Sequence, residues 1–164
     1  MQTHPRTATM AVCPSTLSIQ VREFMAAVGQ DASAKSPTVP DEEIVLLRAR
    51  LIAEEAFETL RALLPHAHLS HLQDMVMRQI SGSALASNRW VDMVGLADGC
   101  ADLDYVVEGT RVAFGIHGVP IANRVHLANM SKLGGPIVDG KQMKPEGWQP
   151  PDIAAALRAQ GWTG

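Results

Sequence analysis

The chain has 164 residues, 46% of them hydrophobic, and a formal net charge of -3 from 14 Lys and Arg against 17 Asp and Glu. This composition excludes a disordered chain and a broad basic surface for duplex nucleic acid. No apolar run reaches the roughly 18 residues of a membrane helix, no signal peptide is evident, and two cysteines cannot form a disulfide framework, so we expect a cytoplasmic protein without nucleic-acid or membrane partners.

Proline positions show where long helices can form, because proline is excluded from helix interiors. Residues 1–14 are expected to be a disordered extension, followed by one domain over 15–164. The remaining intervals predict helices over about 15–29, 41–64, 69–80, 88–114, 120–133 and 152–160. No alternating strand pattern occurs. The predicted fold class is therefore all-α, a bundle of four main helices with a short C-terminal helix.

Acidic side chains lie on the apolar faces of the two longest predicted helices. At about 100° per residue, Glu54, Glu55 and Glu58 fall close together on the 41–64 helix. Asp98 and Asp102 share an apolar face of the 88–114 helix. A carboxylate buried in such a face needs a cation nearby, since an unpaired buried charge is costly. Carboxylates on facing helices thus indicate a site for Mg²⁺ or Mn²⁺.

Several charged groups have a simpler interpretation. A solvated helix flank is the alternative for the three glutamates of the 41–64 helix. Asp104 and Glu108 lie on the opposite side of the 88–114 helix from the two aspartates and are interpreted as surface residues. Histidines at positions 66, 68 and 71 have no acidic partner at metal-ligand spacing, so we expect no zinc site.

Three lysines, Lys132, Lys141 and Lys144, fall in or beside a glycine-rich loop. Ammonium groups on such a loop can bind a polyphosphate, although the Walker sequence is absent. A solubilising tail is the alternative interpretation. Trp148 follows the loop and either stacks on a base or packs the tail onto the helices.

Four motifs in order resemble the MazG-like all-α nucleotide pyrophosphohydrolases, which include dimeric dUTPases and phosphoribosyl-ATP pyrophosphohydrolases. They are EEAFE at 54–58, DGCADLDY at 98–105, VHLANMSK at 125–132 and the tail DGKQMKPEGW at 139–148. The tail resembles a branch with dUTP-hydrolysing members. The resemblance implies a MazG-like helical fold.

The resemblance also implies roles for matching positions. Glu54, Glu55, Glu58 and Asp102 match the acids that hold Mg²⁺ or Mn²⁺, and Glu54 or Glu55 would act as the catalytic base. Family members place a glutamate where this chain has Gly99, so we expect Asp98 to replace it as a metal ligand. The implied substrate-binding residues are Tyr105, His126, Asn129, Lys132, Lys141, Lys144 and Trp148.

The expected activity is Mg²⁺-dependent hydrolysis of a nucleoside triphosphate, such as dUTP, to the monophosphate and pyrophosphate, a house-cleaning reaction of the nucleotide pool. One alternative is a different substrate, either phosphoribosyl-ATP or a non-standard nucleotide. Another is a helical bundle that binds nucleotide without turnover, which the departure at Gly99 keeps open. The resemblance further implies a homodimer or larger homo-oligomer in which both chains complete each site.

Overall fold

The computed structural model describes residues 14–65, 67–82 and 91–164, so most of the predicted extension and the start of the predicted 88–114 helix lie outside the described residues. The helices are α1 (Thr16–Ala27), α2 (Glu42–Leu63), α3 (Ser70–Gly82), α4 (Met93–Ala113), α5 (Gly118–Met130) and α6 (Ile153–Arg158). A hairpin of β1 (Ile137–Val138) and β2 (Lys141–Gln142) lies between α5 and α6. The all-α prediction is confirmed.

The helix ends follow local capping chemistry. The Ser15 hydroxyl accepts the Ser18 N–H at 3.2 Å, which confirms the predicted start of α1. α4 begins at Met93 rather than near residue 88, because the Asp92 carboxylate caps it by accepting two N–H groups of its first turn. α5 ends at Met130 and not at residue 133, since residues 131–133 form a turn.

The hairpin was not expected, and the prediction of no strands is wrong for residues 137–142. Each strand has only two residues, which is too short to show an alternating pattern. The connecting residues Asp139 and Gly140 both have positive φ, 48° and 76°. Asp-Gly is a strong sequence signal for a two-residue hairpin turn of this kind, so the turn was detectable where the strands were not.

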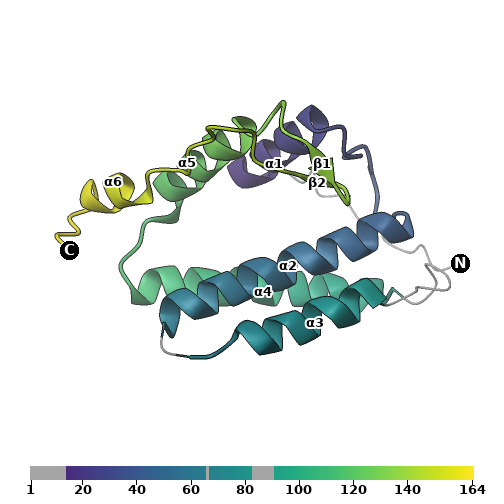
Figure 1. The fold of residues 1–164 in the computed structure, drawn as a ribbon, viewed down its shortest axis with the longest axis horizontal. Helices are drawn as coiled ribbons and strands as arrows, with labels where there is room; N and C mark the ends of the chain where they lie inside the picture. Colours follow the sequence, from purple (N-terminus) through teal and green to yellow (C-terminus); the bar gives the residue numbers. More distant parts are fainter. Residues whose placement is uncertain (1–13, 66, 83–90) are drawn as a thin grey trace, which may run out of the picture.

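The helices form two layers (Figure 1). α1 packs against α5, which also contacts α6, and α2 packs against α3. Few hydrophobic side chains are buried in the described part of the chain, namely Leu47, Phe57, Ala128 and Ala156. α4 runs along the same layer as α2 and α3, but it takes part in none of these closely packed pairs.

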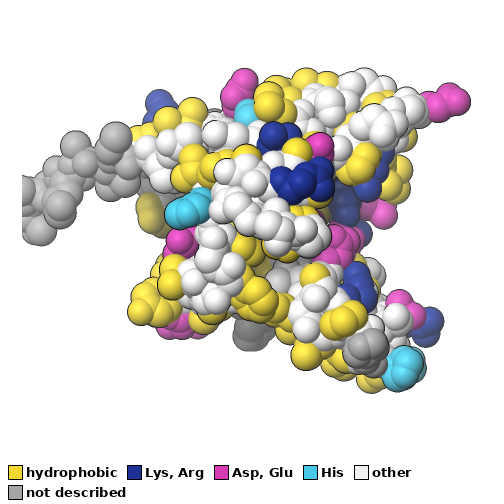
Figure 2. All heavy atoms as spheres, turned by 90° about the vertical axis from the view of Figure 1, so that its left-hand side faces the viewer, with side chains coloured by type: hydrophobic (Ala, Val, Ile, Leu, Met, Phe, Trp, Pro, Cys, Tyr) yellow, Lys and Arg dark blue, Asp and Glu magenta, His cyan; other side chains and the backbone are white. Residues whose placement is uncertain are grey.

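α4 exposes apolar side chains in the single protomer. Val94, Tyr105 and Val112 are 81%, 82% and 72% exposed. Hydrophobic side chains are spread over the face shown in Figure 2, including its lower part, where the layer of α2, α3 and α4 lies. A helix with apolar residues on several sides is normally covered by other protein or by lipid. No described helix has both the length and the hydropathy required for a membrane span.

Candidate functional site

The hairpin lies against the N-terminal half of α2. The backbone of Gly140 sits over Leu47, whose Cδ2 is 3.3 Å from the position of an added Cβ at the glycine. Arg50 of α2 donates to the Asp139 carbonyl oxygen at 3.1 Å, and its guanidinium lies 3.8 Å from the Asp139 carboxylate. These contacts fix the hairpin turn on α2, so the next residue, Lys141, is held above the middle of that helix.

Lys141 and Glu54 form an ion pair between the hairpin and α2. The Lys141 Nζ contacts the Glu54 Oε2, and the two side chains are 42% and 26% exposed. The residues are 87 positions apart in the sequence. The structure thus brings together one predicted catalytic acid and one predicted phosphate-binding lysine. The neighbouring acids Glu55 and Glu58 are exposed on α2.

A second group of predicted site residues gathers at the C-terminal end of α5. Lys132 Nζ donates to Asn129 Oδ1 at 2.8 Å and lies 5.6 Å from the centre of the Trp148 ring. Lys144 Nζ lies 4.7 Å from the same ring. The Trp148 indole N–H donates to the Ala128 carbonyl oxygen at 3.1 Å, so the ring packs the tail onto α5.

The electrostatics of this group link it to α2. Burial lowers the pKa of Lys132 below its ordinary value, and the positive charges of Lys144 and Lys141 lower it further. Glu55 acts in the opposite direction and raises the same pKa. The three lysines therefore form one charged region with Glu54 and Glu55 of α2, which joins two motifs that are far apart in the sequence.

The segment 132–144, which carries the three lysines, is called the lysine loop below. Gln142 holds this loop in place and was not identified from the sequence. Its side chain is 8% exposed, and Nε2 donates to the carbonyl oxygens of Lys132 at 2.9 Å and Gly135 at 2.8 Å. An added Cβ at Gly135 would lie 2.3 Å from the Met143 carbonyl oxygen, so only glycine fits there. A glutamine in a loop carries no sequence signal for such a role, because its burial depends on the tertiary fold.

The predicted residues of α4 are not brought to this region in one protomer. Asp98 and Asp102 are exposed, as is Tyr105. An added Cβ at Gly99 would meet no atom within 4 Å, so packing inside the protomer does not impose a glycine there. Replacement of the missing glutamate by Asp98 stays a prediction.

The five predicted metal ligands have the chemistry that Mg²⁺ prefers, since all are carboxylates. In the described part of a single protomer, however, no three Asp, Glu, His or Cys side chains are grouped so as to hold one ion. Glu54 is paired with Lys141 instead. The residues as placed in one chain therefore do not form a metal site, and the predicted site stays a prediction.

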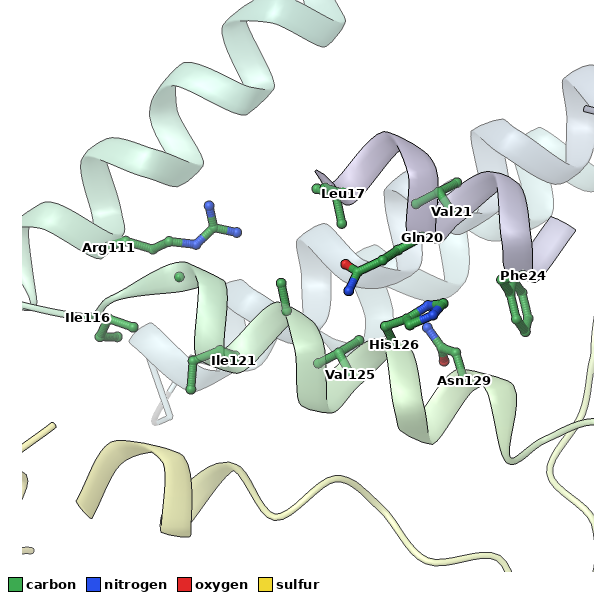
Figure 3. Close-up of a pocket in the computed structure, with 12 residues that line it drawn as sticks. Leu17, Gln20, Val21, Phe24, Arg111, Ile116, Ile121, Val125, His126 and Asn129 are labelled. Carbon is green, nitrogen blue, oxygen red and sulfur yellow. The ribbon is translucent and has the colours of Figure 1, made fainter. Parts of the chain in front are cut away.

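A cavity of about 270 Å³ lies between α1 and α5 (Figure 3). Its apolar walls include Leu17, Val21, Phe24, Ile116, Ile121 and Val125. Gln20, His126 and Asn129 contribute polar groups, and Arg111 reaches it from the end of α4. His126 Nε2 also lies 3.3 Å from Glu23 Oε2. Asn129 connects the cavity to the lysine loop, because its side chain lines the cavity and accepts the Lys132 hydrogen bond.

Residues 21–129 match the family model described as phosphoribosyl-ATP pyrophosphohydrolase. This range is more than half of the chain and contains the acids of α2 and α4 together with His126 and Asn129. It ends before the lysine loop. No curated protein matches the chain.

Proposed function

Because the chain belongs to the phosphoribosyl-ATP pyrophosphohydrolase family, we propose that it hydrolyses dUTP or a related deoxynucleoside triphosphate to the monophosphate and pyrophosphate. Family membership supports a pyrophosphohydrolase that acts on nucleotides. The observation that carries the proposal is the charged region in which Lys141 pairs with Glu54 and Lys132 lies within the electrostatic influence of Glu55. In hydrolysis of a phosphoanhydride, a carboxylate can accept the proton of the attacking water, and cationic side chains can offset the charge on the leaving group.

The substrate would lie across Asn129. Its phosphates would contact the lysine loop, and its base would enter the cavity between α1 and α5, where Gln20 and His126 can hydrogen-bond to the base edge. A volume of about 270 Å³ is large enough for a single base. The apolar walls and the polar groups of the cavity therefore support binding of a nucleotide base.

The reaction needs a base and a stabilised leaving group. A water oxygen attacks the α-phosphorus, the bond to the oxygen that bridges the α- and β-phosphates breaks, and pyrophosphate leaves. Glu54 or Glu55 would accept the proton of the attacking water. Lys132, Lys141 and Lys144 would offset the negative charge that develops on the leaving pyrophosphate.

We also propose that Mg²⁺ or Mn²⁺ takes part, bound by carboxylates of α2 and α4. The proposed ligands are Glu54, Glu55, Glu58, Asp98 and Asp102. A bound divalent cation would lower the pKa of the attacking water and offset phosphate charge. The described residues of one protomer do not gather these acids, so the proposal requires that the α4 of the same chain or of a second copy comes against the acids of α2.

A second copy of the chain is the proposed cover for the exposed apolar face of α4. We expect a dimer in analytical ultracentrifugation at micromolar concentration, and we expect Val94→Lys or Val106→Lys to shift it to the monomer, because either lysine puts a charge into the buried face. Leu72→Lys, on α3, is the matched control, since Leu72 is 50% exposed but lies on another helix. A monomeric parent protein, or dimers unaffected by both α4 variants, would contradict this proposal.

Pyrophosphate release across a nucleotide panel tests the activity itself. The panel contains dUTP, dCTP, dTTP, dATP, ATP and phosphoribosyl-ATP, each with millimolar Mg²⁺, and we expect dUTP or another pyrimidine deoxynucleotide to have the highest kcat/KM. Fastest turnover of phosphoribosyl-ATP would favour the alternative substrate. Nucleotide binding without any pyrophosphate release would show a non-catalytic helical bundle and refute the proposal.

A further inference from the structure

Two lysine ammonium groups share one indole ring at the end of α5. The Nζ atoms of Lys132 and Lys144 lie 5.6 and 4.7 Å from the centre of the Trp148 ring. A cation over an aromatic face is attracted by the negative potential of that face. The ring is itself fixed, because its N–H donates to the carbonyl oxygen of the buried Ala128. Trp148 is therefore a fixed platform for both ammonium groups, and Lys132 is held in addition by its hydrogen bond to Asn129.

Neither of the two charges on this platform is paired directly with a described carboxylate, although Glu55 acts on Lys132 from a greater distance. Among the residues that the structure describes, Lys141 pairs with Glu54, whereas neither Lys132 nor Lys144 forms an ion pair. Like charges repel, and the lowered pKa of Lys132 has Lys144 as one of its causes. Lysine side chains without a constraint would separate and extend into water. The arrangement thus keeps two cations without a direct ion-pair partner in the described part of the chain together, where an anion with several charges can bind.

We propose that Trp148 is a positioning residue that holds Lys132 and Lys144 as a paired binding site for the pyrophosphate group of substrate and product. This inference rests on the proposed function and deepens it, because it assigns Trp148 a role other than stacking on the base. The contacts agree with that role. The two lysine ammonium groups lie over the Trp148 ring, and the cavity suited to a base lies elsewhere, between α1 and α5.

The test uses inorganic pyrophosphate alone, in EDTA, with the full chain and isothermal titration calorimetry. Trp148→Leu is expected to weaken pyrophosphate binding about tenfold, and Trp148→Phe to keep most of it, because phenylalanine retains an aromatic face. Trp162→Leu is the matched control, since Trp162 is 49% exposed and is not the ring over which the two lysines lie. Equal losses for Trp148→Phe and Trp148→Leu, or no loss for Trp148→Leu, would overturn the proposal.

Two further measurements separate positioning from a purely structural role. In a Lys144→Gln background, Trp148→Leu should cost less than in the parent protein, because one of the two positioned cations is already gone. Pyrophosphate binding should also weaken as pH rises through the lowered pKa of Lys132, since only the ammonium form attracts the anion. If Trp148→Leu lets Lys144 move away from Lys132, it removes one of the causes that lower the Lys132 pKa and should move this loss to higher pH, so an unchanged pH profile would count against the proposal.

Pyrophosphate binding in EDTA tests the role of Trp148 independently of catalysis. If pyrophosphate binding depends on Trp148 but no nucleotide is hydrolysed, the positioning role stands and the proposed activity fails. If nucleotides are hydrolysed and pyrophosphate binding is indifferent to Trp148, the activity stands and the positioning role fails.

Discussion

Asp102→Asn is expected to lower nucleotide turnover at least about 100-fold, whereas Asp104→Asn should change it little. Asp102 matches the final aspartate of the family motif and shares a face of α4 with Asp98. Asp104 lies on the opposite face. Both side chains are exposed in the protomer and both substitutions are nearly isosteric, so differences in folding cannot produce the contrast. The measurement is kcat for pyrophosphate release, with circular dichroism to confirm the helical content of each variant.

The contrast between these positions also reports on the assembly. In one protomer α4 packs closely against none of the other described helices, so neither aspartate has a structural reason to matter more. A large loss at Asp102 alone would mean that one face of α4 meets the α2 acids in the functional state. Equal losses at both positions would instead refute the assignment of the two faces and the site built on it.

The positions of the helices could be predicted because they depend on local chemistry. Pro65 ends the range available to α2, Ser15 caps α1, and Pro120 stands in the first turn of α5, where its missing N–H costs no hydrogen bond. These signals act within a few residues along the chain. They also fixed the all-α class, since the intervals between prolines left room for long helices.

The environment of each helix could not be predicted in the same way. The pattern of α4 indicated an apolar face that carries Asp98 and Asp102, but a pattern does not say whether that face is covered within one chain. In the protomer it is exposed. The Glu54–Lys141 pair and the buried Gln142 likewise depend on the docking of a two-residue hairpin onto α2, which is a tertiary event without a local signal.

Lys141→Gln is expected to have opposite effects on metal binding and on turnover. Without nucleotide, Mn²⁺ should bind about three- to tenfold more tightly, because Glu54 loses the ammonium group that competes for its carboxylate. The gain is modest, since partly exposed ion pairs contribute only about 1 kcal/mol. Turnover should fall about 100-fold, the loss typical when one group that stabilises transition-state charge is removed. Mn²⁺ affinity by electron paramagnetic resonance and kcat with dUTP measure the two effects.

Lys144→Gln is the matched control, because it removes the same charge from the same loop but has no ion pair with Glu54. If the competition is specific, Lys144→Gln should leave Mn²⁺ affinity nearly unchanged, and Glu54→Gln should remove the difference between the parent protein and the Lys141 variant. Equal tightening by both lysine variants would show that general positive charge, and not the Glu54 pair, opposes the metal. If Glu54 is a metal ligand, removal of the Lys141 ammonium group frees its carboxylate and should strengthen Mn²⁺ binding. Weaker Mn²⁺ binding in Lys141→Gln would therefore refute the competition.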